Sequence, residues 1–160
     1  MAKARAVSVA EGELVVAADT LVVVDHEVLG KPDDALEANL MLHRLRARSH
    51  DVLTGVALRT NDEQEWGAVV STRVIMRDYT SEHIDAYVAR GEPFDKAGGY
   101  AIQDSRFRPV DRVEACYLNV VGLPLCAVAA GLNAMGTEVM PAGVAPCEYC
   151  RAGAPLVSLG

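Results

Sequence analysis

The sequence predicts an α/β (α+β) fold in which helices flank a mixed, twisted sheet. Short segments rich in β-branched residues alternate with longer segments in which apolar residues recur at helical spacing. Some strand segments follow one another directly, and this order indicates hairpins within the sheet. The 160 residues, 51% of them hydrophobic and 23% charged, are enough for one domain with a core of its own.

Seven segments are predicted to be strands. Val, Ile, Thr and aromatic residues are concentrated in them, and polar residues separate them. Asp25 and His26 predict a hairpin, and the polar segment 61–65 predicts a second pair of strands. Asp19 and Thr20 interrupt the first apolar run and divide it into two strands. The predicted strands are residues 13–18, 21–24, 27–29, 52–60, 66–77, 100–103 and 110–114.

A first helix is predicted for residues 32–47, because a Pro followed by an Asp is a helix start signal. Leu36, Leu40 and Leu45 recur along one side of this helix, and this side is expected to pack on the sheet. Basic residues near its end suit the negative end of the helix dipole.

Two further helices are predicted in the second half of the chain. Thr80 or Ser81 caps the first of them, and Gly91 stands where a left-handed C-terminal cap is favoured. Pro124 opens the second, which is expected to end at Gly136.

The domain is expected to occupy residues 1–138. Residues 139–160 are rich in Pro, Gly and Ala without a clear period, and this composition predicts a loosely attached tail. Cys147 and Cys150 have the spacing of half a zinc site, but structural zinc needs four ligands, so incidental cysteines are favoured over a metal site. The four cysteines are too unevenly spaced for a disulfide framework, and the four histidines, without ligand spacing, are expected at the surface.

Charge and hydropathy exclude two classes of function. The formal net charge of −7 argues against binding to a nucleic-acid backbone, which needs clustered Lys and Arg. A local pocket with two or three basic groups can still hold a phosphate. No apolar run is long enough for a signal peptide or a membrane span, so a cytoplasmic protein without a membrane partner is expected.

Two short segments combine groups suited to chemistry on phosphates. Asp19 and Thr20 place a carboxylate and a hydroxyl where burial is expected, and a buried carboxylate needs a partner. The local pattern supports a catalytic Asp and an Asp that satisfies backbone donors equally. Lys31 precedes a predicted helix N-terminus, a place that suits phosphate oxygens, although a surface lysine beside a turn is favoured when the residue is taken alone.

The segment 91–103 is the most informative part of the sequence. Asp95 can bind a divalent cation, Lys96 can neutralise a phosphate, and Gly98 and Gly99 allow backbone N–H groups to approach an anion closely. A plain polar loop with Gly turns is the alternative. The number of compatible groups in one segment favours the functional interpretation.

Seven short blocks, taken in order, resemble the Maf family. Each block is short, but their joint order is highly specific, and the resemblance covers about residues 3–136. The blocks are residues 16–22, 30–32, 50–56, 72–74, 91–98, 102–103 and 119–124.

The resemblance implies a Maf/ITPase-like two-lobed fold and a nucleoside triphosphate pyrophosphatase that forms the monophosphate and diphosphate with Mg²⁺ or Mn²⁺. Asp19 matches the family's proton acceptor, which would take a proton from the water that attacks the α-phosphorus. Lys31 and Lys96 would neutralise charge on the phosphates, and Asp95 would help hold the metal. The resemblance also implies a homodimer.

Thr20 and Gln103 resemble the branch of the family that acts on dTTP and UTP rather than on 7-methyl-GTP. Their expected role is discrimination between bases, because a mismatched base leaves buried polar groups unpaired. Both residues are therefore expected to bind substrate.

The sequence departs from the family pattern at its beginning. Family members begin with a strand and a Ser-rich, Pro-Arg-Arg segment that completes the phosphate and metal site, whereas residues 1–7 already resemble the end of the following helix. The chain is therefore expected to be N-terminally shortened, through a late start assignment or a lost strand. This departure leaves an alternative open, a catalytically weak or inactive nucleotide-binding homologue linked to cell division, and a zinc-linked interaction module is a third hypothesis.

Overall fold

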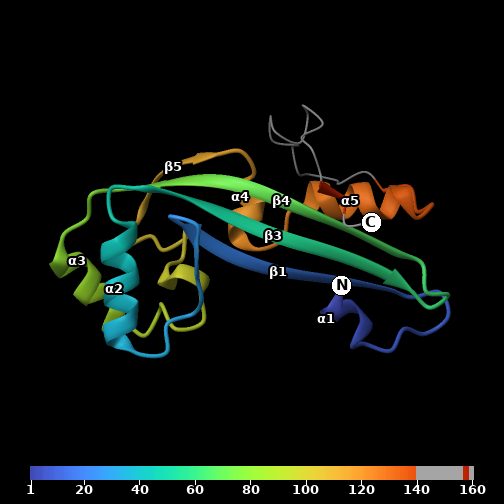
Figure 1. Cartoon of the computed structure of the whole chain (residues 1–160), viewed down its shortest axis with the longest axis horizontal. Coiled ribbons are helices and arrows are strands. Elements are labelled where there is room, and N and C mark those ends of the chain that lie inside the picture. Colours follow the sequence, from blue (N-terminus) through green and yellow to red (C-terminus); the bar gives the residue numbers. More distant parts are fainter. Residues whose placement is uncertain (140–156, 159–160) are drawn as a thin grey trace. The chain divides into compact units, whose positions relative to one another are not determined.

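The computed structural model describes residues 1–139 and 157–158 (Figure 1). The chain divides into two compact units. Unit 1 comprises Met1–Thr20, Leu53–Ser71 and Ala115–Gly160, and unit 2 comprises Leu21–Val52 and Thr72–Glu114. Two units agree with the two-lobed fold expected from the sequence. Most of the expected tail, with Cys147 and Cys150, lies outside the described residues.

A sheet flanked by helices confirms the α/β (α+β) class. Its strand order is β2-β1-β3-β4-β5, and β6 also pairs with β4. The pairs β1/β2, β4/β5 and β4/β6 are antiparallel. The strands are β1 (Leu14–Val24), β2 (Glu27–Leu29), β3 (Ser49–Thr60), β4 (Glu65–Met76), β5 (Val110–Glu114) and β6 (Val157–Ser158).

The first hairpin of unit 2 is confirmed. Asp25 and His26 have φ angles of 51° and 65°, and they connect β1 to β2 with Val24 opposite Glu27. A two-residue turn with positive φ at both positions matches the right-handed twist of the strands. The predicted break at Asp19 and Thr20 is wrong, since β1 runs through both residues as one strand.

Helix α2 (Ala35–Leu45) covers part of unit 2, but with a different face from the predicted one. The side chain of Asp34 caps it by accepting from the backbone N–H of Glu37 at 2.8 Å. Leu36 and Leu40 are 69% and 60% exposed. Leu45 is buried, as expected, but it belongs to a stripe of helical period that excludes Leu36 and Leu40: Ala38, Met41, Leu42 and Leu45.

Helix α3 (Ser81–Val88) begins at the predicted cap. The Thr80 hydroxyl accepts from the backbone N–H of His83, and the His83 ring accepts from the backbone N–H of Thr80. The buried face of α3 contributes Tyr87, whose ring stacks on Phe107 with centroids 4.5 Å apart. Aromatic packing of this kind anchors the loop that follows α3 to the helix.

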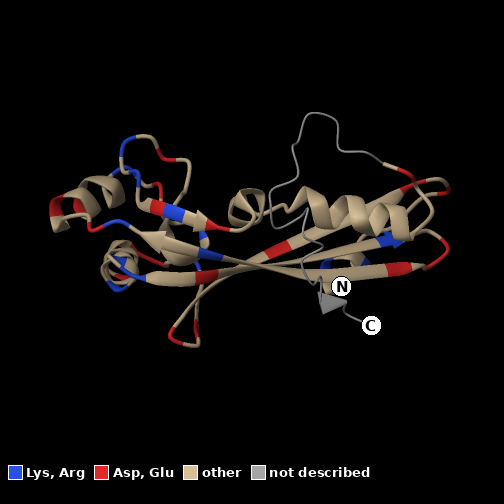
Figure 2. Cartoon of the chain, turned by 90° about the horizontal axis from the view of Figure 1, so that it is seen from above, with Lys and Arg blue, Asp and Glu red and all other residues tan. Residues whose placement is uncertain are grey.

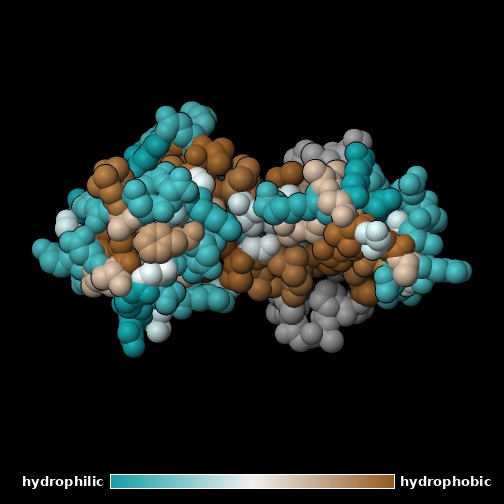
Figure 3. Space-filling view, turned by 90° about the horizontal axis from the view of Figure 1, so that it is seen from below, coloured by the Kyte–Doolittle hydropathy of each residue, from teal (hydrophilic) through white to brown (hydrophobic). Residues whose placement is uncertain are grey.

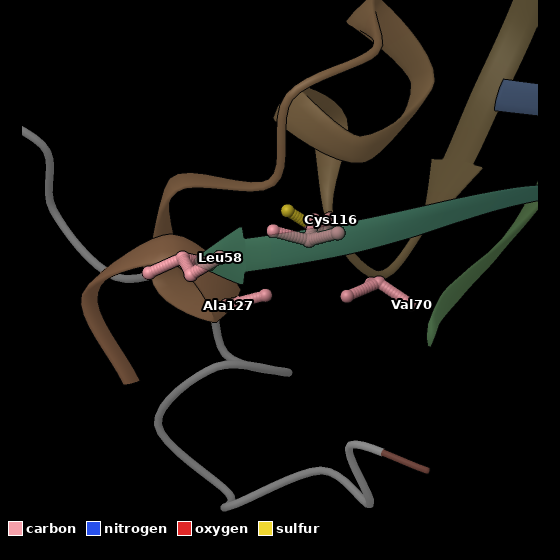
Figure 4. Close-up of a cluster of buried hydrophobic side chains, with 5 residues drawn as sticks. Leu58, Val70, Cys116 and Ala127 are labelled. Atoms are coloured by element: carbon pink, nitrogen blue, oxygen red, sulfur yellow. The ribbon is translucent and has the colours of Figure 1, made fainter. Parts of the chain in front are cut away.

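Unit 1 contains three helices: α1 (Ala2–Arg5), α4 (Tyr117–Val121) and α5 (Leu125–Ala134). Its hydrophobic core is formed by residues of the sheet together with α4, its N-cap Cys116 and α5. Figure 4 shows Leu58, Val70, Cys116 and Ala127 gathered in this core. Pro124 stands at the N-cap of α5, as predicted. Gly131 of α5 packs on Trp66, and a Cβ added there would lie 2.5 Å from Cε3 of the indole ring.

Charge and hydropathy are mixed over the surface of the described residues. Basic and acidic positions are interspersed (Figure 2), and hydrophobic side chains reach the surface among hydrophilic ones (Figure 3). Among the described residues, no helix has the length and apolar composition to cross a membrane.

Candidate functional site

The six predicted site residues fall into both units, and each group is described within its own unit. Unit 1 holds Asp19 and Thr20 on β1. Unit 2 holds the others, in the turn before α2 and in the loop between α3 and β5: Lys31, Asp95, Lys96 and Gln103.

Asp19 is an exposed carboxylate rather than the buried one expected. Its side chain is 65% exposed, and Nζ of Lys3 donates to its Oδ1 at 2.5 Å. The alternation of side chains along β1 turns this position toward solvent, where water can reach the carboxylate. Lys3 belongs to the four-residue helix α1, and a link to Asp19 follows from the fold rather than from any spacing in the sequence.

Thr20 lies on the opposite face of β1 from Asp19, because successive side chains of a strand point to opposite faces. Its hydroxyl lies 2.9 Å from the hydroxyl of buried Thr54, which donates to the backbone carbonyl of Asn119 at 3.1 Å. A hydroxyl has one proton, so Thr20 donates to Thr54. The oxygen of Thr20 can then serve a ligand as an acceptor.

In unit 2, the turn at Gly30 is bound to the loop that carries Asp95. The backbone N–H of Gly98 donates to the carbonyl of Gly30 at 2.8 Å. Gly98 has a φ of 70°, and a Cβ there would lie 3.0 Å from Cγ1 of Val22. Glycine is therefore required for this close approach. The hydrogen bond between Gly98 and Gly30 brings the exposed Lys31 near Asp95, and the charge of Lys31 helps to lower the pKa of Asp95.

Asp95 and Lys96 form an ion pair at the start of this loop. Nζ of Lys96 donates to Oδ1 of Asp95 at 2.5 Å and to the carbonyl of Glu92 at 2.8 Å. The hydrogen bond from Lys96, helped by the charge of Lys31, lowers the pKa of Asp95. An ammonium has three donors, so one donor of Lys96 remains for a phosphate oxygen.

Gln103 lies in an exposed turn, and the predicted strand at residues 100–103 is wrong. The backbone N–H of Ala101 donates to the hydroxyl of Tyr87 at 3.0 Å, instead of to a strand partner. The carboxylate of Asp104 accepts from the backbone N–H groups of Arg106 and Phe107. The turn that contains Gln103 is closed by the backbone N–H of Asp104, which donates to the carbonyl of Ala101 at 3.2 Å, and the side-chain bonds fix the backbone on either side of it.

His50 was expected at the surface, but the structure buries it. The residue is 3% exposed, and Nε2 lies 2.7 Å from the hydroxyl of Tyr100, which is also buried. Burial lowers the pKa of His50 to about 4, against an opposing effect of Asp51, so the ring is neutral at pH 7. An apolar environment on β3 could be anticipated from the valines that alternate after His50, but its tyrosine partner could not.

Metal binding has one candidate ligand in the expected place. Among residues 1–139, no group of three or more His, Cys, Asp and Glu side chains gathers in a form suited to a metal ion. Mg²⁺ is commonly held by one or two carboxylates together with substrate phosphates. The exposed carboxylate of Asp95 fits that mode of binding, if the ion replaces Lys96 on it.

Comparison with known proteins identifies relatives across most of the chain. Residues 1–135 match the family model described as Maf-like protein. The chain is 54% identical over 114 residues to a dTTP/UTP pyrophosphatase of Thermomicrobium roseum, covering 71% of this chain and 52% of that protein. It is 46% identical over 138 residues to one of Geobacter sp. (strain M21), covering 84% and 70%.

A third relative, the dTTP/UTP pyrophosphatase of Symbiobacterium thermophilum, is 49% identical over 142 residues, covering 88% of this chain and 73% of the relative. The chain spans 52%, 66% and 66% of the first three curated relatives. The family match extends over more than half of the chain and includes all six predicted site residues. The chain therefore belongs to the Maf family.

Proposed function

We propose that this chain is a nucleoside triphosphate diphosphatase that hydrolyses dTTP or UTP to the monophosphate and diphosphate. The observation that carries the proposal is the binding of the Gly30 turn to the Asp95 loop through Gly98, which gathers two lysines and a carboxylate in unit 2. The relatives of Thermomicrobium roseum and Geobacter sp., both dTTP/UTP pyrophosphatases, support the substrate class.

In this proposal Asp19 acts as the general base. Its exposed carboxylate takes a proton from water as the water oxygen bonds to the α-phosphorus, and the bond from that phosphorus to the bridging oxygen breaks to release diphosphate. Lys3, hydrogen-bonded to Asp19, holds the carboxylate in one orientation.

The lysines of unit 2 supply positive charge for the triphosphate. Lys31 and the remaining donor of Lys96 fit phosphate oxygens, and positioning with charge neutralisation provides much of the rate in phosphoryl transfer. A Mg²⁺ or Mn²⁺ ion held by Asp95 would polarise the phosphate oxygens that it binds. To hold such an ion, Asp95 would give up its ion pair with Lys96.

Base discrimination is assigned to Thr20 and Gln103. Because Thr20 donates its proton to Thr54, its oxygen accepts from a substrate donor. The N3–H of thymine and uracil is such a donor, whereas N3 of cytosine is an acceptor. The Gln103 amide carries donors and an acceptor and can pair with the edge of a pyrimidine, while Thr20 separates uracil and thymine from cytosine.

The test is release of diphosphate from dTTP, UTP, CTP, GTP and 7-methyl-GTP with Mg²⁺, beside equilibrium binding of the same nucleotides. Turnover that is highest with dTTP and UTP supports the proposal. Binding of UTP without release of diphosphate contradicts it and favours the catalytically weak or inactive nucleotide-binding alternative. The homodimer and the cytoplasmic location remain predictions from the sequence.

A further inference from the structure

Two buried polar side chains of unit 2 lie outside the proposed chemistry. Nε2 of His50, on β3, is 2.7 Å from the hydroxyl of Tyr100, and the two rings meet edge to face with centroids 5.4 Å apart. His50 and Tyr100 are 3% and 6% exposed. Burial lowers the pKa of His50 and raises the pKa of Tyr100, so both side chains are uncharged in this position.

Tyr100 lies within the segment that carries three of the proposed site residues. Lys96 precedes it by four residues and Gln103 follows it by three. The segment lacks strand pairing, so separate contacts define its path. On either side of Tyr100, Gly98 is bound to the Gly30 turn and Ala101 is bound to the hydroxyl of Tyr87 on α3.

The hydrogen bond between Tyr100 and His50 joins this segment to β3 through two side chains. A buried hydroxyl without a partner is unfavourable, so the pair favours the conformation in which the segment lies on β3. Both residues are too deeply buried to touch a nucleotide at the surface. Their influence on a reaction must therefore pass through the backbone of the segment.

We propose that His50 and Tyr100 are positioning residues: their hydrogen bond fixes residues 95–103 on β3 and thereby sets the places of the charged and amide groups that bind nucleotide. The effect of this hydrogen bond on kcat rests on the proposed function. The structural part of the inference, the order of residues 95–103, can be measured without any turnover.

The first test is hydrogen exchange of the backbone amides of residues 95–103 in Tyr100→Phe and in Tyr79→Phe. Tyr79 is a matched control, since its buried hydroxyl also makes one hydrogen bond in unit 2, to the carbonyl of Leu42 at 2.8 Å. Loss of the Tyr100 hydroxyl is expected to speed exchange in the segment roughly fivefold, the effect of one hydrogen bond. Equal exchange in the two variants would overturn the inference.

The second test asks whether hydrogen bonding, rather than ring packing, is required at position 50. His50→Gln retains a donor and an acceptor, whereas His50→Leu removes both. Exchange in residues 95–103 is expected to be fast in His50→Leu and to return toward the wild-type rate in His50→Gln. Wild-type exchange in His50→Leu contradicts a positioning role.

The kinetic test compares UTP hydrolysis by Tyr100→Phe and Tyr79→Phe at a temperature where both variants are folded. A positioning role predicts roughly a tenfold lower kcat for Tyr100→Phe, with a smaller change in KM, and unchanged constants for Tyr79→Phe. Faster exchange with unchanged kcat and KM overturns the inference and leaves the proposed function intact. A wild-type chain without turnover contradicts the proposed function, while the exchange tests still decide the order of the segment.

Discussion

Lys3 and Asp19 are 16 residues apart in the sequence, yet Nζ of Lys3 lies 2.5 Å from Oδ1 of Asp19. Both side chains are about two-thirds exposed, 63% and 65%, so solvent weakens the attraction between them. The pair is therefore unlike a structural ion pair of a protein core. The pair instead holds an accessible carboxylate on β1 in one orientation through a lysine from α1.

Lys3→Met is expected to change Tm by at most a few degrees, because an exposed ion pair contributes little to stability. The same substitution is expected to lower kcat/KM for UTP about tenfold, since Asp19, the proposed base, loses its partner. Arg112→Met is the matched control, because it removes another exposed ion pair, to Glu114. Equal activity in Lys3→Met and the control would remove Lys3 from the mechanism.

Thr54→Val is expected to relax discrimination between UTP and CTP. Without the acceptor at Thr54, the Thr20 hydroxyl is free to donate, so it can pair with N3 of cytosine as well as accept from N3–H of uracil. The measurement is the ratio of kcat/KM for UTP to that for CTP. Thr54→Ser keeps the hydroxyl and should keep the ratio; a ratio equally high in Thr54→Val would argue against a role of Thr20 at the base.

Stability is expected to fall as the pH drops from about 6.5 toward 4 because of His50. Its pKa in the folded chain, about 4, lies below the ordinary value of 6.5, so the unfolded state binds more protons in this range and acid favours unfolding. The stabilisation is complete above pH 6.5, and its full loss corresponds to roughly 3 kcal/mol. The groups that act on the ring are Tyr100 and Asp51.

Urea unfolding at several pH values measures this dependence. His50→Gln should show a flatter decline in the free energy of unfolding between pH 6.5 and 4 than the wild type. If the slopes of wild type and His50→Gln coincide, His50 is not the group responsible.

Gly131→Ala is expected to destabilise unit 1 by about 1–3 kcal/mol, the range for adding a methyl group to a filled core. The added Cβ would lie 2.5 Å from Cε3 of Trp66, so the indole ring or α5 has to shift. Gly55→Ala on β3 is the matched control, because nothing lies within 4 Å of its added Cβ. Denaturant midpoints that are equal for the two variants would contradict this packing.

The sequence predicted features that depend on local chemistry. The hairpin at Asp25 and His26, the cap at Thr80 and the helix opened by Pro124 are each specified by a few neighbouring residues. The family resemblance rests on blocks of the same kind. These are the features that short-range backbone preferences decide.

Features that depend on the fold could not be predicted in the same way. Leu36, Leu40 and Leu45 favoured one face of α2, but of these three only Leu45 is buried, on the face that also carries Met41 and Leu42. His50 has no ligand spacing and was expected at the surface, whereas the sheet buries it against Tyr100. Lys3 becomes a neighbour of Asp19 through the return of the chain from α1 to β1.

The role of Asp19 is tested by release of diphosphate from UTP by the wild-type chain and by Asp19→Asn, with UTP binding measured in parallel. The exposed position of Asp19 predicts that Asn leaves the fold and UTP binding nearly intact. Hydrolysis should fall by at least about a hundredfold, the usual contribution of a general base. Turnover in Asp19→Asn equal to that of the wild type would contradict the central claim that Asp19 is the base.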